Sequence, residues 1–101
     1  MKNLDFSKEE DRQSFYCSKE WRALRELLLS QKPLCVKCLS NGVITPAEEI
    51  DHILPLRFYP DERFNSQNLQ PLCKPCHSEK TYQETLAKRK LNLYKPLWKK
   101  A

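Results

Sequence analysis

The sequence predicts a small α+β domain that a bound metal ion stabilises. Short segments with the alternation of β-strands and longer segments with helical periodicity occur in one chain, at residues 43–45, 49–53 and 68–72 for strands and 18–31 and 75–90 for helices. Two Cys-x-x-Cys pairs lie between these segments. A chain of 101 residues buries a limited share of its surface and often needs a bound metal or disulfides to stabilise its fold.

Composition limits the classes of function. The formal charge of +5 favours a polyanionic partner. No apolar run is long enough for a membrane helix, and the first residues lack the apolar core of a signal peptide, so we expect a cytoplasmic protein. In that compartment paired cysteines bind metal more often than they form disulfides.

The chain is expected to divide into an N-terminal arm (1–17), a single domain (18–90) and a basic extension (91–101). Residues 1–15 show little patterning, which predicts a loosely held arm. Ser18 is a candidate N-cap for a helix that ends before Pro33. Cys17 and Trp21 begin its apolar stripe, so Cys17 is expected to be a small buried hydrophobe. Trp21 fits the core better than it fits base stacking.

The centre of the chain predicts two strands joined by a long connection. Residues 54–67 are rich in Pro, Arg, Asp, Asn and Ser, and connections of this length tend to be functional. Gly42, the single glycine, is expected where the backbone needs a positive φ. Pro71 implies a strand edge or end, and Pro75 suits the first turn of the final helix.

Four cysteines form the candidate structural metal site: Cys35, Cys38, Cys73 and Cys76. Two pairs with the same spacing can close a tetrahedral site around Zn²⁺. The alternatives are a redox dithiol, two disulfides or an iron–sulfur centre. A redox pair normally belongs to a larger α/β fold, which this pattern does not supply, so structural zinc is favoured.

A second constellation combines Asp51, His52, Asn68 and His77. Because Asp51 and His52 are neighbours on a predicted strand, their side chains point to opposite faces, so one can bind a metal while the other handles a proton. A neutral imidazole is a good proton acceptor near pH 7, since its unperturbed pKa is about 6.5. Taken singly, Asn68 could be a turn residue and His77 a further zinc ligand.

The order Cys-x-x-Cys, Asp-His-Ile-x-Pro, Asn-Leu-Gln-x-Leu-Cys-x-x-Cys-His-x-x-Lys resembles the HNH endonucleases, especially small zinc-stapled ones of bacteriophages. The resemblance covers roughly residues 33–82. It implies a ββα-metal fold (HNH, or His-Me finger), with flanking helices, that hydrolyses phosphodiester bonds. The leading dipeptide has aspartate where some members have histidine.

The resemblance also implies roles for single residues. Asp51 and His77 match the ligands of one catalytic divalent ion, and His52 matches the general base that activates water. Asn68 matches the asparagine that holds the long loop, and that in some members approaches the metal. Arg57 and Lys80, the last residue of the motif, match less closely as phosphate contacts. The basic arm adds further candidates for the same role: Lys88, Arg89 and Lys90.

A site of carboxylate and imidazole suits Mg²⁺ or Mn²⁺, with Ni²⁺ or Zn²⁺ as alternatives. The expected partner is double-stranded DNA, nicked or cut on both strands, in a bacterial or phage-infected cell. A link to phage terminase or packaging proteins is implied by the family alone. The rival hypotheses are a non-catalytic zinc knuckle that binds nucleic acid or protein, and a toxin-like DNase.

Overall fold

A two-stranded antiparallel sheet lies at the centre of the fold. The computed structural model describes residues 4–91 and pairs β1 (Glu49–His52) with β2 (Leu69–Leu72). In the register Asp51 lies opposite Gln70, and Ile50 lies opposite Pro71. Pro71 has no backbone N–H, which a sheet of two strands tolerates because each strand has a free edge. The strands predicted at residues 49–53 and 68–72 are confirmed to within one residue.

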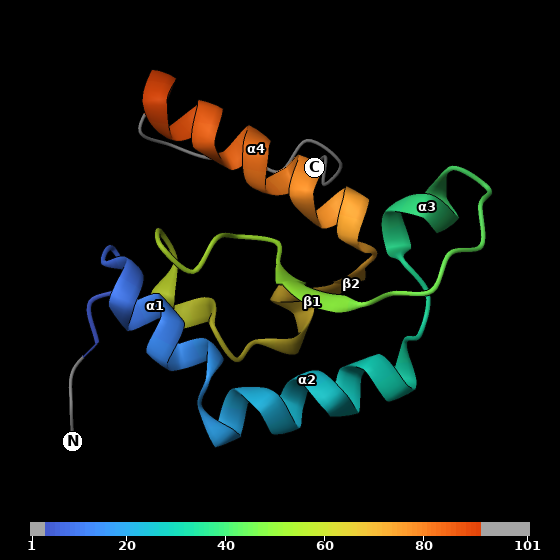
Figure 1. Cartoon of the computed structure of the whole chain (residues 1–101), viewed down its shortest axis with the longest axis horizontal. Helices are drawn as coiled ribbons and strands as arrows, with labels where there is room; N and C mark the ends of the chain where they lie inside the picture. The colour runs from blue at the N-terminus through green and yellow to red at the C-terminus, as the bar shows by residue number, and fades with distance from the viewer. Residues whose placement is uncertain (1–3, 92–101) are drawn as a thin grey trace.

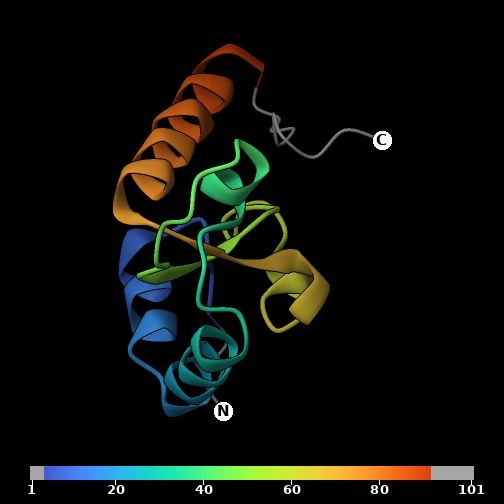
Figure 2. The same ribbon diagram turned by 90° about the vertical axis from the view of Figure 1, so that its right-hand side faces the viewer.

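Two helices contact β1 from opposite sides. These are α2 (Lys19–Gln31) and α4 (Lys74–Leu91), with the sheet between them in both views (Figures 1 and 2). The backbone N–H of Trp21 donates to Ser18 Oγ at 3.2 Å, which confirms the predicted N-cap. Trp21 and Leu28 are buried, so the helical stripe faces the core as expected. Cys17 is exposed, and the prediction of a buried thiol is wrong because the stripe starts only after the cap.

The segment before Ser18 is part of the fold. It contains α1 (Glu9–Tyr16), and both Phe6 and Phe15 are buried in the main core. The expectation of a loosely held arm is therefore wrong for residues 4–15. Most of α1 is charged or polar, so a single buried phenylalanine gave no helical periodicity to detect.

The strand predicted at Val43–Thr45 is also absent. The first cysteine pair lies at α3 (Val36–Ser40), with Cys35 as its N-cap and Cys38 inside the helix. Gly42 has a φ of 77°, as expected. Val43 and Ile44 are exposed, so this segment has no buried face to pair. One isolated bridge joins Leu34 to Pro46 instead.

The connection between the strands carries two short 3₁₀ helices, η1 (Pro60–Glu62) and η2 (Ser66–Asn68). The main core is apolar and lies between the sheet, α1 and α2: Phe6, Phe15, Trp21, Leu28, Ile50, Leu56 and Leu69. A smaller cluster surrounds the buried thiols of Cys35 and Cys73. None of the helices in residues 4–91 has the length and hydropathy that a membrane span needs. The basic extension predicted from residue 91 lies outside the described residues except for Leu91.

Candidate functional site

The four paired cysteines converge on one point. Their sulfur atoms all lie within 4.8 Å of one another. Cys38 Sγ is 3.8 Å from Cys73 Sγ and 3.7 Å from Cys76 Sγ. In a tetrahedral site with Zn–S bonds of about 2.3 Å, neighbouring sulfurs are about 3.8 Å apart. The donor set and its spacing therefore fit zinc.

The cysteine cluster connects two elements that are distant in sequence. Cys35 caps α3, and its sulfur accepts a hydrogen bond from the backbone of Cys38 at 3.5 Å. Cys73 lies between the end of β2 and the start of α4, and Cys76 lies in the first turn of α4. Because His77 follows Cys76 directly, a metal bound by these thiols would also fix the position of His77.

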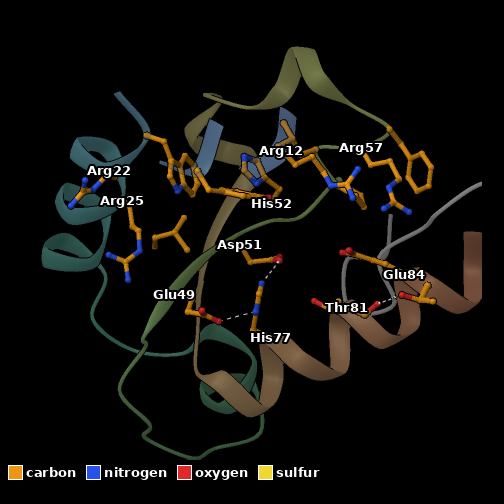
Figure 3. A pocket seen from close by; sticks show the side chains of 17 residues that line it. Arg12, Arg22, Arg25, Glu49, Asp51, His52, Arg57, His77, Thr81 and Glu84 are labelled. Carbon is orange, nitrogen blue, oxygen red and sulfur yellow. Dashed lines mark hydrogen bonds and ion pairs between the residues drawn. The ribbon is translucent and has the colours of Figure 1, made fainter. Parts of the chain in front are cut away.

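A candidate catalytic metal site lies between β1 and α4. Asp51 Oδ1 is 3.6 Å from His77 Nε2 (Figure 3). Two ligands that are each about 2.1 Å from one ion can be up to about 4.2 Å apart, so this pair fits a single divalent cation. Carboxylate oxygen and imidazole nitrogen together suit Mn²⁺ and related ions. The structure thus brings together the two predicted ligands.

Glu49 completes this site and was missed by the sequence analysis. Its Oε2 lies 2.7 Å from His77 Nδ1. The carboxylate accepts the Nδ1 proton and leaves the Nε2 lone pair facing Asp51, the arrangement that orients a metal-binding histidine. The signal was present, because residues two apart on a strand share a face and Glu49 precedes Asp51 by two.

His52 points to the other side of β1, as predicted. Its ring stacks on Trp21 with centroids 4.9 Å apart and an interplanar angle of 20°. His52 Nε2 lies 3.0 Å from the carbonyl oxygen of Arg63. A carbonyl only accepts, so Nε2 carries the proton and Nδ1 is the basic nitrogen. Burial lowers the pKa of His52 and keeps the imidazole neutral.

Asn68 is buried and holds the connection between the strands. Its Oδ1 accepts from Leu54 N at 2.7 Å, and its Nδ2 donates to Leu54 O and Glu62 O, both at 3.2 Å. Arg63 follows Glu62, so these bonds place the carbonyl that His52 uses. The amide is engaged with the loop backbone, which agrees with the loop-holding role and not with a metal ligand.

Asp51, His52, His77 and Glu49 all line one pocket of about 600 Å³. Four arginines also line it: Arg12, Arg22, Arg25 and Arg57. Arg22 and Arg25 project from α2 on one side of His52, whereas Arg12 and Arg57 lie on the other (Figure 3). None of the four forms a salt bridge within the described part of the chain. The pocket therefore offers cationic groups to an anionic ligand.

Of the two predicted phosphate contacts whose side chains the structure describes, Arg57 lines the pocket and Lys80 does not. The prediction that Lys80 contacts phosphate is wrong, because its side chain is fully buried and its ammonium faces inward to Asp51. The side chains of Lys88, Arg89 and Lys90 lie outside the described residues. Arg12, Arg22 and Arg25 were missed because α1 was not predicted and the position of α2 beside the site depends on tertiary packing.

Comparison with known proteins gives a consistent result. A family model described as HNH endonuclease matches residues 35–83. A curated relative, the "Probable HNH endonuclease" of Lactococcus phage SK1, is 38% identical over 72 residues, which cover 66% of this chain and 74% of the relative.

A solved structure is also similar. It is the HNH endonuclease of the deep-sea thermophilic bacteriophage GVE2 with manganese ion, with a TM-score of 0.71 and 37% identity. The match covers 76% of this chain and 85% of the phage protein. At this identity the similarity extends beyond the fold to the sequence.

Proposed function

Since the chain belongs to the HNH endonuclease family and is a nuclease, we propose that it hydrolyses DNA with His52 as general base and a divalent ion held by Asp51 and His77. One observation carries this proposal. The Asp51–His77 pair, with its donors 3.6 Å apart, and the neutral ring of His52 line the same arginine-containing pocket. A ligand pair and a base that share one pocket can act on the same phosphate.

In the proposed reaction His52 Nδ1 accepts a proton from the attacking water. The water oxygen forms a bond to phosphorus while the bond from phosphorus to the 3′-oxygen breaks. The ends produced are a 5′-phosphate and, after the leaving oxygen takes a proton from solvent, a 3′-hydroxyl. When bound, the divalent ion supplies Lewis-acid chemistry that neutralises charge on the phosphate and the leaving oxygen.

Two contacts keep His52 ready to accept the proton. The Arg63 carbonyl fixes the Nε2–H tautomer at 3.0 Å, and the Trp21 ring restricts rotation of the imidazole. Burial beside Trp21 also disfavours the charged form before catalysis. Asn68 supports the arrangement through the loop and does not touch the reacting atoms.

Manganese is the ion to test first, because the similar phage structure contains manganese. Magnesium is the alternative for the same ligands, and Ni²⁺ or Zn²⁺ are further candidates. Zinc is proposed for the four cysteines, with a structural role only.

The proposed substrate is double-stranded DNA. The four arginines on both sides of His52 support it, since guanidinium groups bind phosphates well. We also propose that the enzyme acts in the cytoplasm of a phage-infected bacterium, alongside terminase or other packaging proteins. The support for this setting is that both similar proteins are phage proteins.

The two histidines of the chain provide a matched test. In plasmid nicking assays with Mn²⁺, His52→Ala should lose cleavage and keep Mn²⁺ affinity, whereas His77→Ala should lose both. Zinc content and circular dichroism serve as controls for the fold. Equal nicking by His52→Ala would refute the base assignment. Absence of cleavage by the wild type with Mg²⁺, Mn²⁺ or Ni²⁺ would favour a zinc-knuckle binding module.

A further inference from the structure

The buried lysine of α4 needs an explanation that a DNA contact does not supply. Lys80 is 0% exposed, and it is among the largest fully buried side chains described. A buried ammonium costs free energy unless good partners replace its water. Lys80 lies beside Asp51 of the candidate metal site, so its hydrogen-bond partners there indicate its role.

Three oxygens from the described part of the chain contact the ammonium of Lys80. Nζ donates to the backbone carbonyl of His52 at 2.7 Å and lies 3.1 Å from Asp51 Oδ2. The third partner is the Glu84 carboxylate, one helical turn further along α4. A lysine has three N–H donors, so these oxygens can use all of them.

Because of these contacts, the two carboxylate oxygens of Asp51 have different partners. Oδ2 is held by Lys80 and also accepts from Gln70 Nε2 at 3.0 Å. Oδ1 is the oxygen that faces His77 Nε2. The carboxylate is thus oriented to offer a single oxygen to a cation.

The same ammonium holds the backbone beside the proposed base. Asp51 and His52 are consecutive, and Lys80 binds the side chain of the first and the carbonyl of the second. We propose that Lys80 is a positioning residue that fixes the metal ligand Asp51 and the base His52 relative to each other. This role rests on the proposed function, and it replaces the phosphate contact expected from the sequence.

Glu84 is the counter-ion that makes this arrangement compatible with metal binding. Lys80 alone would cancel the negative charge of Asp51 and reduce its attraction for a cation. The Lys80–Glu84 pair has no net charge, so Asp51 keeps its charge for the ion. Glu84 itself lines the pocket and is partly buried.

The double variant Lys80→Met/Glu84→Met removes the ammonium without changing the net charge. Apolar replacement of a buried ion pair is often tolerated by the fold. We expect thermal stability and zinc content close to wild type. Mn²⁺ affinity, measured by calorimetry, should fall about 10- to 100-fold, the usual effect of losing a residue that orients a metal ligand. In nicking assays kcat should fall while KM for DNA stays unchanged.

Wild-type Mn²⁺ affinity and kcat in the folded double variant would overturn the proposal and leave Lys80 a structural residue. A raised KM with unchanged Mn²⁺ affinity would overturn it in favour of a phosphate contact. If the double variant does not fold, Lys80→Arg replaces it, because the planar guanidinium keeps the charge but cannot reproduce the three contacts from one point. Unchanged Mn²⁺ affinity in that variant would equally overturn the proposal.

The metal readout separates this test from the proposed function. Mn²⁺ binding by wild-type protein that cuts no DNA would refute the nuclease proposal. The comparison of affinities between wild type and variants would still test the role of Lys80.

Discussion

Phe15 links the N-terminal helix to the proposed base, and its truncation is the clearest test of that link. The Phe15 side chain is 4% exposed. Its ring centroid lies 5.3 Å from that of Trp21 and 5.9 Å from that of His52. Phe15→Ala would therefore open a void beside the ring that is proposed to take the proton. It also tests whether the segment before Ser18 belongs to the domain or is an arm, as the sequence predicted.

The expected loss in the free energy of unfolding follows from the burial of Phe15. Truncation of a buried phenylalanine to alanine usually costs about 3–5 kcal/mol. Domains of this size have a total free energy of unfolding of about 5–15 kcal/mol and lose about 4–8 °C of Tm per kcal/mol. The Tm of the zinc-loaded protein should thus fall by at least about 12 °C. Cleavage should fall as well at temperatures where the variant is folded, because the imidazole is no longer restrained on one side.

Phe64 provides a matched control. It contacts Phe15 with centroids 5.4 Å apart, but its side chain is 44% exposed. Phe64→Ala should therefore lower Tm by less than half as much, as measured by calorimetry or circular dichroism. Equal shifts for the two variants, or a Phe15→Ala shift below about 4 °C, would refute the assignment of α1 to the core.

The remaining predictions concern the two metal sites. Glu49→Gln should weaken Mn²⁺ binding about 10- to 100-fold, because the neutral amide no longer fixes the Nδ1–H form of His77; an unchanged calorimetric affinity would contradict this role. Strong chelation, or Cys35→Ser at a sulfur that is fully buried, should unfold the domain, since structural zinc supplies about 10–16 kcal/mol of apparent binding free energy in small domains. Circular dichroism that survives chelation unchanged would show that zinc does not hold the fold.

Several features of this protein follow from local sequence because their causes are local. Ser18 caps α2 by accepting a hydrogen bond from the backbone N–H of Trp21, three residues later. Gly42 adopts a positive φ at a turn. The cysteine spacing likewise predicted a site that the sulfur distances fit. The family resemblance carried by the order Asp-His, Asn, His also predicted that Asp51 and His77 would lie close together, as they do.

The incorrect sequence predictions have a common physical cause. Whether these side chains are buried depends on packing against elements that are distant in the sequence. Phe6 and Phe15 gave no periodic signal, yet α1 is held by contacts with α2 and the His52 ring. Val43 and Ile44 have strand propensity, but both side chains are exposed, so burial does not favour a strand there. Cys17 is in phase with the apolar face of α2, but it precedes the N-cap Ser18 and its side chain is exposed.

The sequence by itself determined the strands at residues 49–53 and 68–72, the main helices, the cysteine cluster and the residues proposed here as metal ligands and base. Their signals are spacings, caps and turns within a few residues. Only the tertiary structure decided that Glu49 orients His77, that arginines of α1 and α2 line the pocket, and that Lys80 faces Asp51. A side chain's partner across elements depends on how the helices pack against β1, and that packing is not encoded in any single segment.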